Sequence, residues 1–185
     1  MRALRKSGRR CVLVTGRTLP SLRSVFAELE LFDAIVAENG ALLYWPKDDK
    51  RVALAAPPPP AFLSALHARG VRPLEIGEAV VATRTPYEGA VIETIRQLGL
   101  DLQVIFNKGA VMVLPAGVTK ASGLGAWLER SGIAGHSVVA VGDAENDLSL
   151  LAACEASAAV ATRCPAFRRS ATSCSRAITG PACAS

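Results

Sequence analysis

The sequence has few aromatic residues and no long apolar run, and each shortage excludes a class of protein. Aromatic residues make up 5% of the chain, so the base-stacking side chains that single-strand nucleic-acid binding uses are scarce. No apolar stretch reaches the roughly 18 residues of a membrane span. The apolar run that follows the basic start, Cys11–Val14, is also too short for the apolar region of a signal peptide. We therefore expect a cytoplasmic protein that binds neither nucleic acid nor a membrane.

The positive charge of the chain is concentrated at its two ends. The net charge is +5, but residues 1–23 hold seven Lys or Arg and residues 156–185 hold four Arg, with no acidic residue in either segment. The rest of the chain holds ten basic and 16 acidic side chains, so its middle is acidic. A nucleic-acid-binding face needs clustered Lys and Arg together with aromatic residues. The charge distribution therefore does not favour a nucleic-acid partner.

The cysteines are not spaced as metal ligands or as a redox pair. The chain has five of them and no Cys-x-x-Cys motif: Cys11, Cys154, Cys164, Cys174 and Cys183. Both histidines, His67 and His136, stand far from the cysteines in sequence. A zinc site is therefore not expected, and the odd count indicates free thiols. Cys11 and Cys154 have apolar neighbours and are predicted to be small core residues.

Strands and helices alternate at both ends of the sequence. Apolar runs without alternation predict fully buried parallel strands at Cys11–Val14, Ala34–Ala37, Val138–Val141 and Ala158–Ala161. Helices are predicted between these runs, at Leu19–Leu29, Lys120–Ser131 and Asn146–Cys154. This alternation implies an open α/β sheet with right-handed crossovers.

Residues 46–115 follow a different pattern, which predicts a small α+β module inserted into the sheet domain. Its predicted elements are a helix at Ala61–Arg69, a strand at Ala79–Thr83, a helix at Pro86–Leu98 and a hairpin around Asn107–Gly109. The proline run Pro57–Pro60 is interpreted as a stiff connector. We therefore expect a core formed by residues 1–45 and 116–185, with residues 46–115 as a cap.

Polar residues follow the predicted strands, where ligands of open α/β sheets bind. Thr15, Gly16 and Arg17 come directly after the first strand, and Lys120 begins a helix after the inserted module. A hydroxyl group, a backbone free to approach an anion and an ammonium group are together complementary to a phosphoryl group.

The segment "GDAEND" follows the strand at Val138–Val141 and supplies Asp143, Glu145, Asn146 and Asp147. Paired carboxylates are the ligands that Mg²⁺ takes in proteins, together with water and substrate phosphate. Alone, the segment could equally be an acidic helix start that the helix dipole favours. The order of all three motifs along the chain favours a metal-assisted phosphate site.

In this order the motifs resemble the haloacid dehalogenase-like superfamily and, within it, the Cof-type hydrolases with a C2 cap. The resemblance is carried by "LVTGR", "AENGALLY", the lysine after the inserted module and "VGDAENDLSLL", and it extends from about Leu4 to Ala171. It implies a Rossmann-like parallel-sheet core with an inserted α+β cap. It also implies Mg²⁺-dependent hydrolysis of a small phosphorylated metabolite, such as a phosphosugar, through an aspartyl-phosphate.

The resemblance implies roles for the residues that match its motifs. Thr15 would bind phosphate, with Gly16 and Arg17 beside it, and Lys120 would position the nucleophile and neutralise charge. Thr15 and Lys120 are therefore the expected catalytic residues of this chain.

Five further residues receive roles from the same resemblance. Asp143 would be a metal ligand, and Asp147 would bind Mg²⁺ directly or through water. Asn146 would contact phosphate or a metal-bound water, and Asn39 and Gly40 would lie near the substrate where the cap begins.

The sequence lacks the motif that should supply the nucleophile. In the family, an aspartate in the pattern Asp-x-Asp-Gly-Thr attacks phosphorus, and a second aspartate is the general acid and base. Here no Asp precedes Asp33, and Asp33 begins a different strand. We interpret the chain as an N-terminally shortened form of such a hydrolase, with a tail that departs from the family pattern from about residue 172.

Two functional predictions remain open. One is a phosphatase of this family, represented by a chain that is itself inactive. The other is a non-catalytic remnant, or a module that binds a phosphorylated ligand through Thr15, Lys120 and Asp143.

Overall fold

The computed structural model describes residues 4, 6–142 and 147–159 of the chain. It divides into two compact units, Met1–Gly123 and Leu124–Ser185, and each is described by itself. The predicted site residues Asp143 and Asn146 lie outside the described residues, as does the tail from residue 160.

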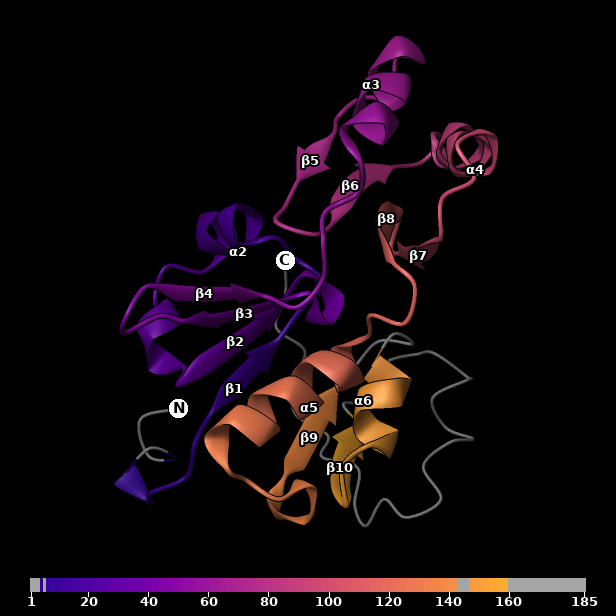
Figure 1. Cartoon of the computed structure of the whole chain (residues 1–185). Coiled ribbons are helices and arrows are strands. Elements are labelled where there is room, and N and C mark those ends of the chain that lie inside the picture. Colours follow the sequence, from indigo (N-terminus) through magenta and orange to yellow (C-terminus); the bar gives the residue numbers. More distant parts are fainter. Residues whose placement is uncertain (1–3, 5, 143–146, 160–185) are drawn as a thin grey trace. The chain divides into compact units, whose positions relative to one another are not determined.

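The first unit begins with a mixed sheet of four strands in the order β1-β2-β3-β4 (Figure 1). The strands are β1 (Val12–Val14), β2 (Ala34–Ala37), β3 (Leu42–Trp45) and β4 (Lys50–Ala53). β1 pairs with β2 in parallel, whereas β2, β3 and β4 pair antiparallel. The parallel pair joined by a helix is the α/β arrangement that the sequence predicts.

Helix α2 (Leu19–Val25) packs on one face of this sheet. Thr18 caps its N-terminus by accepting a hydrogen bond from the Ser21 amide. Its apolar residues form a core with alternate sheet residues and with the short helix η1 (Leu29–Leu31). This core contains Leu19, Leu22, Leu29, Phe32, Ile35, Ala37, Leu42 and Tyr44, with Cys11 and Leu13 packed against it. Cys11 is therefore the small core residue that was predicted.

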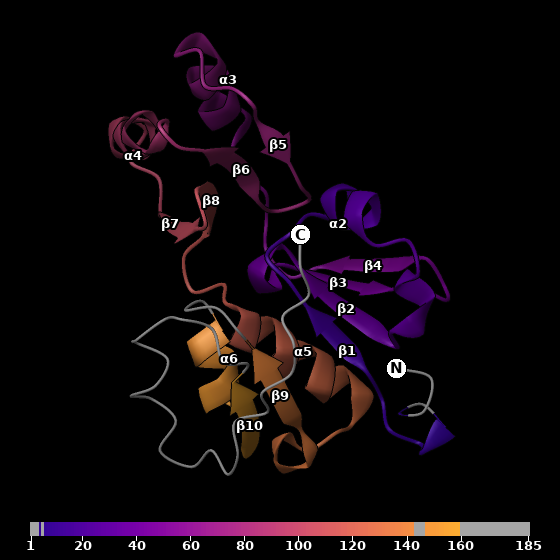
Figure 2. The same ribbon diagram turned by 180° about the vertical axis from the view of Figure 1, so that it is seen from behind.

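The second sheet of this unit has the order β5-β6-β8-β7 and is antiparallel throughout (Figure 2). Its elements are α3 (Pro60–Ala68), β5 (Glu75–Ile76), β6 (Val81–Arg84), α4 (Glu88–Gln97), β7 (Leu102–Asn107) and β8 (Ala110–Pro115). Residues of β8 alternate between two clusters: Val111 and Val113 pack with the residues of α3 and α4, whereas Met112 and Leu114 belong to the other cluster. The helices therefore cover one face of the sheet.

Helix α5 (Lys120–Ser131) begins in the first unit and continues into the second. It is followed by η3 (Gly135–Ser137), β9 (Val139–Gly142), α6 (Leu148–Ala152) and β10 (Ala156–Ala159). β9 and β10 pair in parallel, which again agrees with the α/β prediction. No helix in the described ranges is long and apolar enough to cross a membrane.

Two details of the sequence prediction are wrong. The helix predicted at Leu19–Leu29 ends at Val25, because Phe26 takes an extended backbone conformation. The ring of Phe26 then packs against that of Phe32, with 5.8 Å between the ring centroids. The strand β9 is not buried on both faces, since Val139 and Val141 are 69% and 63% exposed. Its only strand partner among the described residues is β10, so one edge stays open.

The first sheet extends beyond the predicted start of the inserted segment. The sequence placed this start at residue 46, but β4 at Lys50–Ala53 still pairs with β3 in the first sheet. The turn between them is closed by Asp49, which has a positive φ of 47°. The first sheet therefore continues to Ala53, and the division into core and cap remains a prediction.

Candidate active site

The loop after β1 is held by the neighbouring strand. The Thr15 amide donates a hydrogen bond of 2.8 Å to the Val36 carbonyl, and the Arg17 amide donates one of 3.2 Å to the Thr15 hydroxyl oxygen. A hydroxyl that accepts from an amide two residues ahead stabilises a turn. The Thr15 hydroxyl therefore lies in a fixed turn at the carboxyl end of β1 and keeps its proton to donate.

The turn after β2 joins this loop to the rest of the first unit. Glu38 and Asn39 have φ values of 54° and 55°, and Gly40 has 107°, a left-handed run that is costly for the two side-chain-bearing residues. The run turns two amides toward the loop after β1: Glu38 donates to Arg17 and Asn39 donates to Thr15, both at 3.0 Å. The predicted residues Thr15, Arg17, Asn39 and Gly40 are therefore brought together at one edge of the sheet.

The Asn39 side chain is buried beside Gly16. Its Nδ2 donates to the Met112 sulfur at 3.3 Å, but its Oδ1 is buried and has no hydrogen-bond partner among the residues that the structure describes. A Cβ at position 16 would lie 3.0 Å from this oxygen, so a glycine lets the loop approach the amide closely. A buried acceptor without a partner is uncommon in proteins, which makes Oδ1 a candidate contact for a ligand that donates a hydrogen bond.

Lys120 is buried at the first residue of α5, with 7% of its surface exposed. The helix start is fixed by a reciprocal pair of hydrogen bonds, in which Ser122 N donates to Thr119 Oγ1 at 3.1 Å and Thr119 N donates to Ser122 Oγ at 2.9 Å. Gly40 lies directly against this turn, because a Cβ added to Gly40 would lie 2.7 Å from the Thr119 carbonyl carbon. The turn after β2 thus contacts both the Thr15 loop and the helix start that carries Lys120.

This close contact predicts opposite effects of the same substitution at two positions of α5. A Cβ at Gly123 would lie 2.5 Å from Gly40 Cα and 2.6 Å from Val36 Cγ1, whereas a Cβ at Gly125 meets nothing within 4 Å. Gly123→Ala should lower the free energy of unfolding by about 3 kcal/mol, because the Gly40 backbone cannot move aside. Gly125→Ala should raise it by about 0.5–1 kcal/mol through helix propensity. Urea unfolding followed by circular dichroism measures both, and equal effects would contradict the contact.

Asp147 lies in the second unit, next to the end of β9. It is the residue before α6 but does not cap the helix with its side chain. Its Oδ2 would lie 3.0 Å from a Cβ at Gly142, so the carboxylate folds back over the end of the strand. A buried carboxylate in this place fits a hard cation such as Mg²⁺. Within the described ranges there is no group of three or more His, Cys, Asp or Glu that could hold a metal ion.

The structure adds residues that the sequence did not indicate. Glu38 received no predicted role, although it precedes Asn39 in the segment "AENGALLY". Its side chain makes the hydrogen bonds that link the two sheets. A charged residue directly after a fully buried strand was the available signal. Met112 could not be predicted, because its contact with Asn39 joins segments that are 73 residues apart.

A model of the haloacid dehalogenase-like hydrolases matches residues 78–176 of the chain. A phosphoglycolate phosphatase of Halorubrum lacusprofundi is 31% identical over 170 residues, which cover 86% of this chain and 74% of that protein. The chain belongs to the haloacid dehalogenase-like hydrolase family. The predicted family and the prediction of a hydrolase are therefore confirmed.

Other comparisons agree with this family. A phosphoglycolate phosphatase of Methanothermobacter thermautotrophicus is 28% identical over 176 residues, covering 91% of this chain and 77% of the relative. The fold matches the crystal structure of a haloacid dehalogenase-like hydrolase from Bacteroides thetaiotaomicron, with a TM-score of 0.74, 18% identity and coverage of 92% and 82% of the two chains. It also matches a subclass IIB sugar phosphatase, with a TM-score of 0.71, 16% identity and coverage of 92% and 81%. The predicted fold class is confirmed, and the curated relatives support the coarser functional prediction of a phosphatase.

Proposed function

We propose that this site binds the phosphate monoester of a small metabolite together with Mg²⁺, and that it hydrolyses the ester only when an attacking carboxylate completes it. The observation that supports this most is the turn at Glu38–Gly40, which contacts the Thr15 loop on one side and the helix start at Lys120 on the other. The loop that carries the hydroxyl donor and the helix start that carries the buried lysine thus contact the same turn. Such preorganised donors stabilise the charge of a phosphoryl group in transfer.

Each residue has a distinct part in this proposal. The Thr15 hydroxyl and the Gly16 amide donate hydrogen bonds to phosphate oxygens, and the Lys120 ammonium offsets their negative charge. Arg17 adds positive charge to the loop after β1. Asn39 Oδ1 accepts a hydrogen bond from a hydroxyl group of the substrate. Mg²⁺, when bound, would neutralise charge on the phosphate.

In this proposal Asp143 and Asp147 hold the Mg²⁺ ion, and Asn146 contacts phosphate or a metal-bound water. The described part of this set, Asp147, offers the oxygen ligand that the ion prefers. The two catalytic groups assigned to the chain itself are Thr15 and Lys120. Similarity to phosphoglycolate phosphatases makes phosphoglycolate the first substrate to test, with phosphosugars second.

The attacking group is not supplied by the aspartate that comes first in the sequence. Asp33 lies at the amino end of β2, where its Oδ2 accepts from the Cys11 amide at 2.8 Å and its Oδ1 lies 3.7 Å from Lys47 Nζ. Thr15 lies past the carboxyl end of β1, and the two strands are parallel. Asp33 is therefore at the opposite edge of the sheet from the phosphate loop. This placement favours the second candidate function, a module that binds a phosphorylated ligand without turning it over.

Both candidate functions predict that phosphate binding depends on Lys120. Lys120→Met should weaken the binding of inorganic phosphate by about 10- to 100-fold, because a charge-assisted hydrogen bond is worth about 1.5–3 kcal/mol. Lys47→Met is the matched control, since it removes the same charge at the opposite edge of the first sheet. Isothermal titration calorimetry measures both. Equal phosphate affinity in the two variants would contradict the assignment of Lys120.

A further inference from the structure

Glu38 is a buried carboxylate with an unusual set of partners. Only 1% of its surface is exposed. Its Oε1 accepts a hydrogen bond of 2.9 Å from the Glu78 amide, and its Oε2 accepts bonds of 2.8 and 3.0 Å from the amides of Ala79 and Val80. Three consecutive backbone amides thus converge on one side chain that lies about 40 residues earlier in the sequence.

The receiving turn between β5 and β6 is shaped around this carboxylate. The Gly77 amide donates to the Val80 carbonyl at 2.8 Å, which closes the turn. A Cβ at Gly77 would lie 2.5 Å from Glu38 Cδ and 2.7 Å from its Oε2, so only glycine leaves room for the carboxylate. The turn at 77–80 is therefore built to receive the Glu38 side chain.

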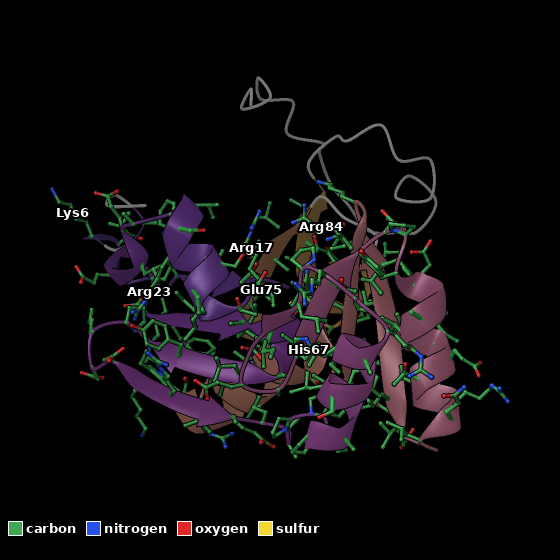
Figure 3. The ribbon with its side chains drawn as sticks, turned by 90° about the horizontal axis from the view of Figure 1, so that it is seen from above. Lys6, Arg17, Arg23, His67, Glu75 and Arg84 are labelled. Atoms are coloured by element: carbon green, nitrogen blue, oxygen red, sulfur yellow. The ribbon has the colours of Figure 1, made fainter. Side chains whose placement is uncertain are left out.

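The backbone of Glu38 has a second role, in the first sheet. Its amide donates to the Arg17 carbonyl in the loop that carries Thr15. A second contact joins the same region to β5, where the Thr18 hydroxyl donates to the Glu75 carboxylate. Glu75 is labelled in Figure 3. One residue thus touches the Thr15 loop through its backbone and the β5–β6 turn through its side chain.

We propose that Glu38 is a positioning residue that holds the β5–β6 turn of the second sheet against the phosphate-binding loop. The proposal rests on the proposed function only in that it treats the Thr15–Arg17 loop as the loop that binds phosphate. Glu38 does not contact the phosphate. It fixes how the segment at 77–80 faces the loop, and a substrate held at Thr15 therefore meets a preset surface beyond its phosphate group.

Hydrogen exchange of the amides at 78–80 tests the contact directly. In the unchanged chain these amides should exchange slowly, and in Glu38→Gln they should exchange about 10- to 100-fold faster, because bonds to a charged acceptor are lost. Glu93→Gln is the matched control, because Glu93 is an exposed carboxylate on helix α4 that accepts a hydrogen bond from Arg96. It should leave exchange at 78–80 unchanged.

Adding inorganic phosphate separates a positioning role from a purely structural one. Phosphate should slow exchange at 78–80 in the unchanged chain and in Glu93→Gln, but not in Glu38→Gln, although that variant still binds phosphate. Unchanged exchange at 78–80 in Glu38→Gln, or equal slowing by phosphate in all three chains, would overturn the proposal. If the unchanged chain binds no phosphate, the proposed function is wrong. The exchange rates without phosphate would still show whether the Glu38 carboxylate holds the amides at 78–80.

A second variant covers the case in which Glu38→Gln does not fold. Gly77→Ala keeps Glu38 but places a methyl group where its carboxylate lies. It should speed exchange at 78–80 to a similar extent and leave exchange in helix α4 as it was. Slow exchange at 78–80 in Gly77→Ala would contradict the proposed contact.

Discussion

Hydrolysis of an aryl phosphate by this chain in the presence of Mg²⁺ is expected to stay at the buffer background. The covalent route needs a carboxylate that attacks phosphorus, and removing such a nucleophile costs several orders of magnitude in rate. No aspartate precedes Asp33 in the sequence, and Asp33 is held by Cys11 and Lys47 at the far edge of the sheet. The measurement is the release of nitrophenol, with an active phosphatase of the same family as the positive control. Turnover that matches this phosphatase and is abolished by Asp143→Asn would mean that another residue attacks.

Extending the chain at its N-terminus by a strand and an Asp-x-Asp-Gly-Thr loop is expected to raise hydrolysis by several orders of magnitude. The structure offers edges for such a strand: β1 pairs only with β2, and β9 only with β10, among the described strands.

Two controls accompany the extended chain. The same extension with both aspartates changed to asparagine should stay at background, because it restores the strand without the nucleophile. Lys120→Met in the active extended chain should lower kcat strongly, since its ammonium stabilises charge that develops in transfer. Activity in the double-asparagine extension would show that the added strand acts through the fold alone.

The fold was predictable where local pattern and burial coincide. The run Ala34–Ala37 is entirely apolar and forms β2 with the predicted bounds, and the helix at Lys120–Ser131 has its capping residues in the sequence. The strand β4 was missed because half of "KRVA" is charged and the segment becomes a strand by pairing with β3. Pairing between strands leaves no pattern in the sequence of the segment itself, so such strands cannot be predicted from it. The strand β5, which has only two residues, was missed for the same reason.

The residues of the site were predictable from the order of the motifs, but the contacts that join them were not. Thr15, Asn39 and Gly40 were named from the sequence, and the structure brings them together through hydrogen bonds between backbone groups. Glu38 acts through a side chain that reaches 40 residues along the chain, and the Gly40–Thr119 contact joins segments that are even further apart. Contacts of this kind depend on the positive φ values of the turn, which Asn39 favours but which the type of Glu38 does not indicate.

The most direct test of the proposed Mg²⁺-assisted phosphatase is the Mg²⁺ affinity of the extended chain compared with that of the chain described above. In the proposed site Asp143 and Asp147 hold the ion, and the nucleophile of the extended chain would add a further carboxylate ligand. Titration calorimetry with Mg²⁺ should therefore show tighter binding in the extended chain, and Asp143→Ala should abolish both this gain and the hydrolysis. An extended chain that binds Mg²⁺ no better, or that still hydrolyses phosphate after Asp143→Ala, would contradict the assignment.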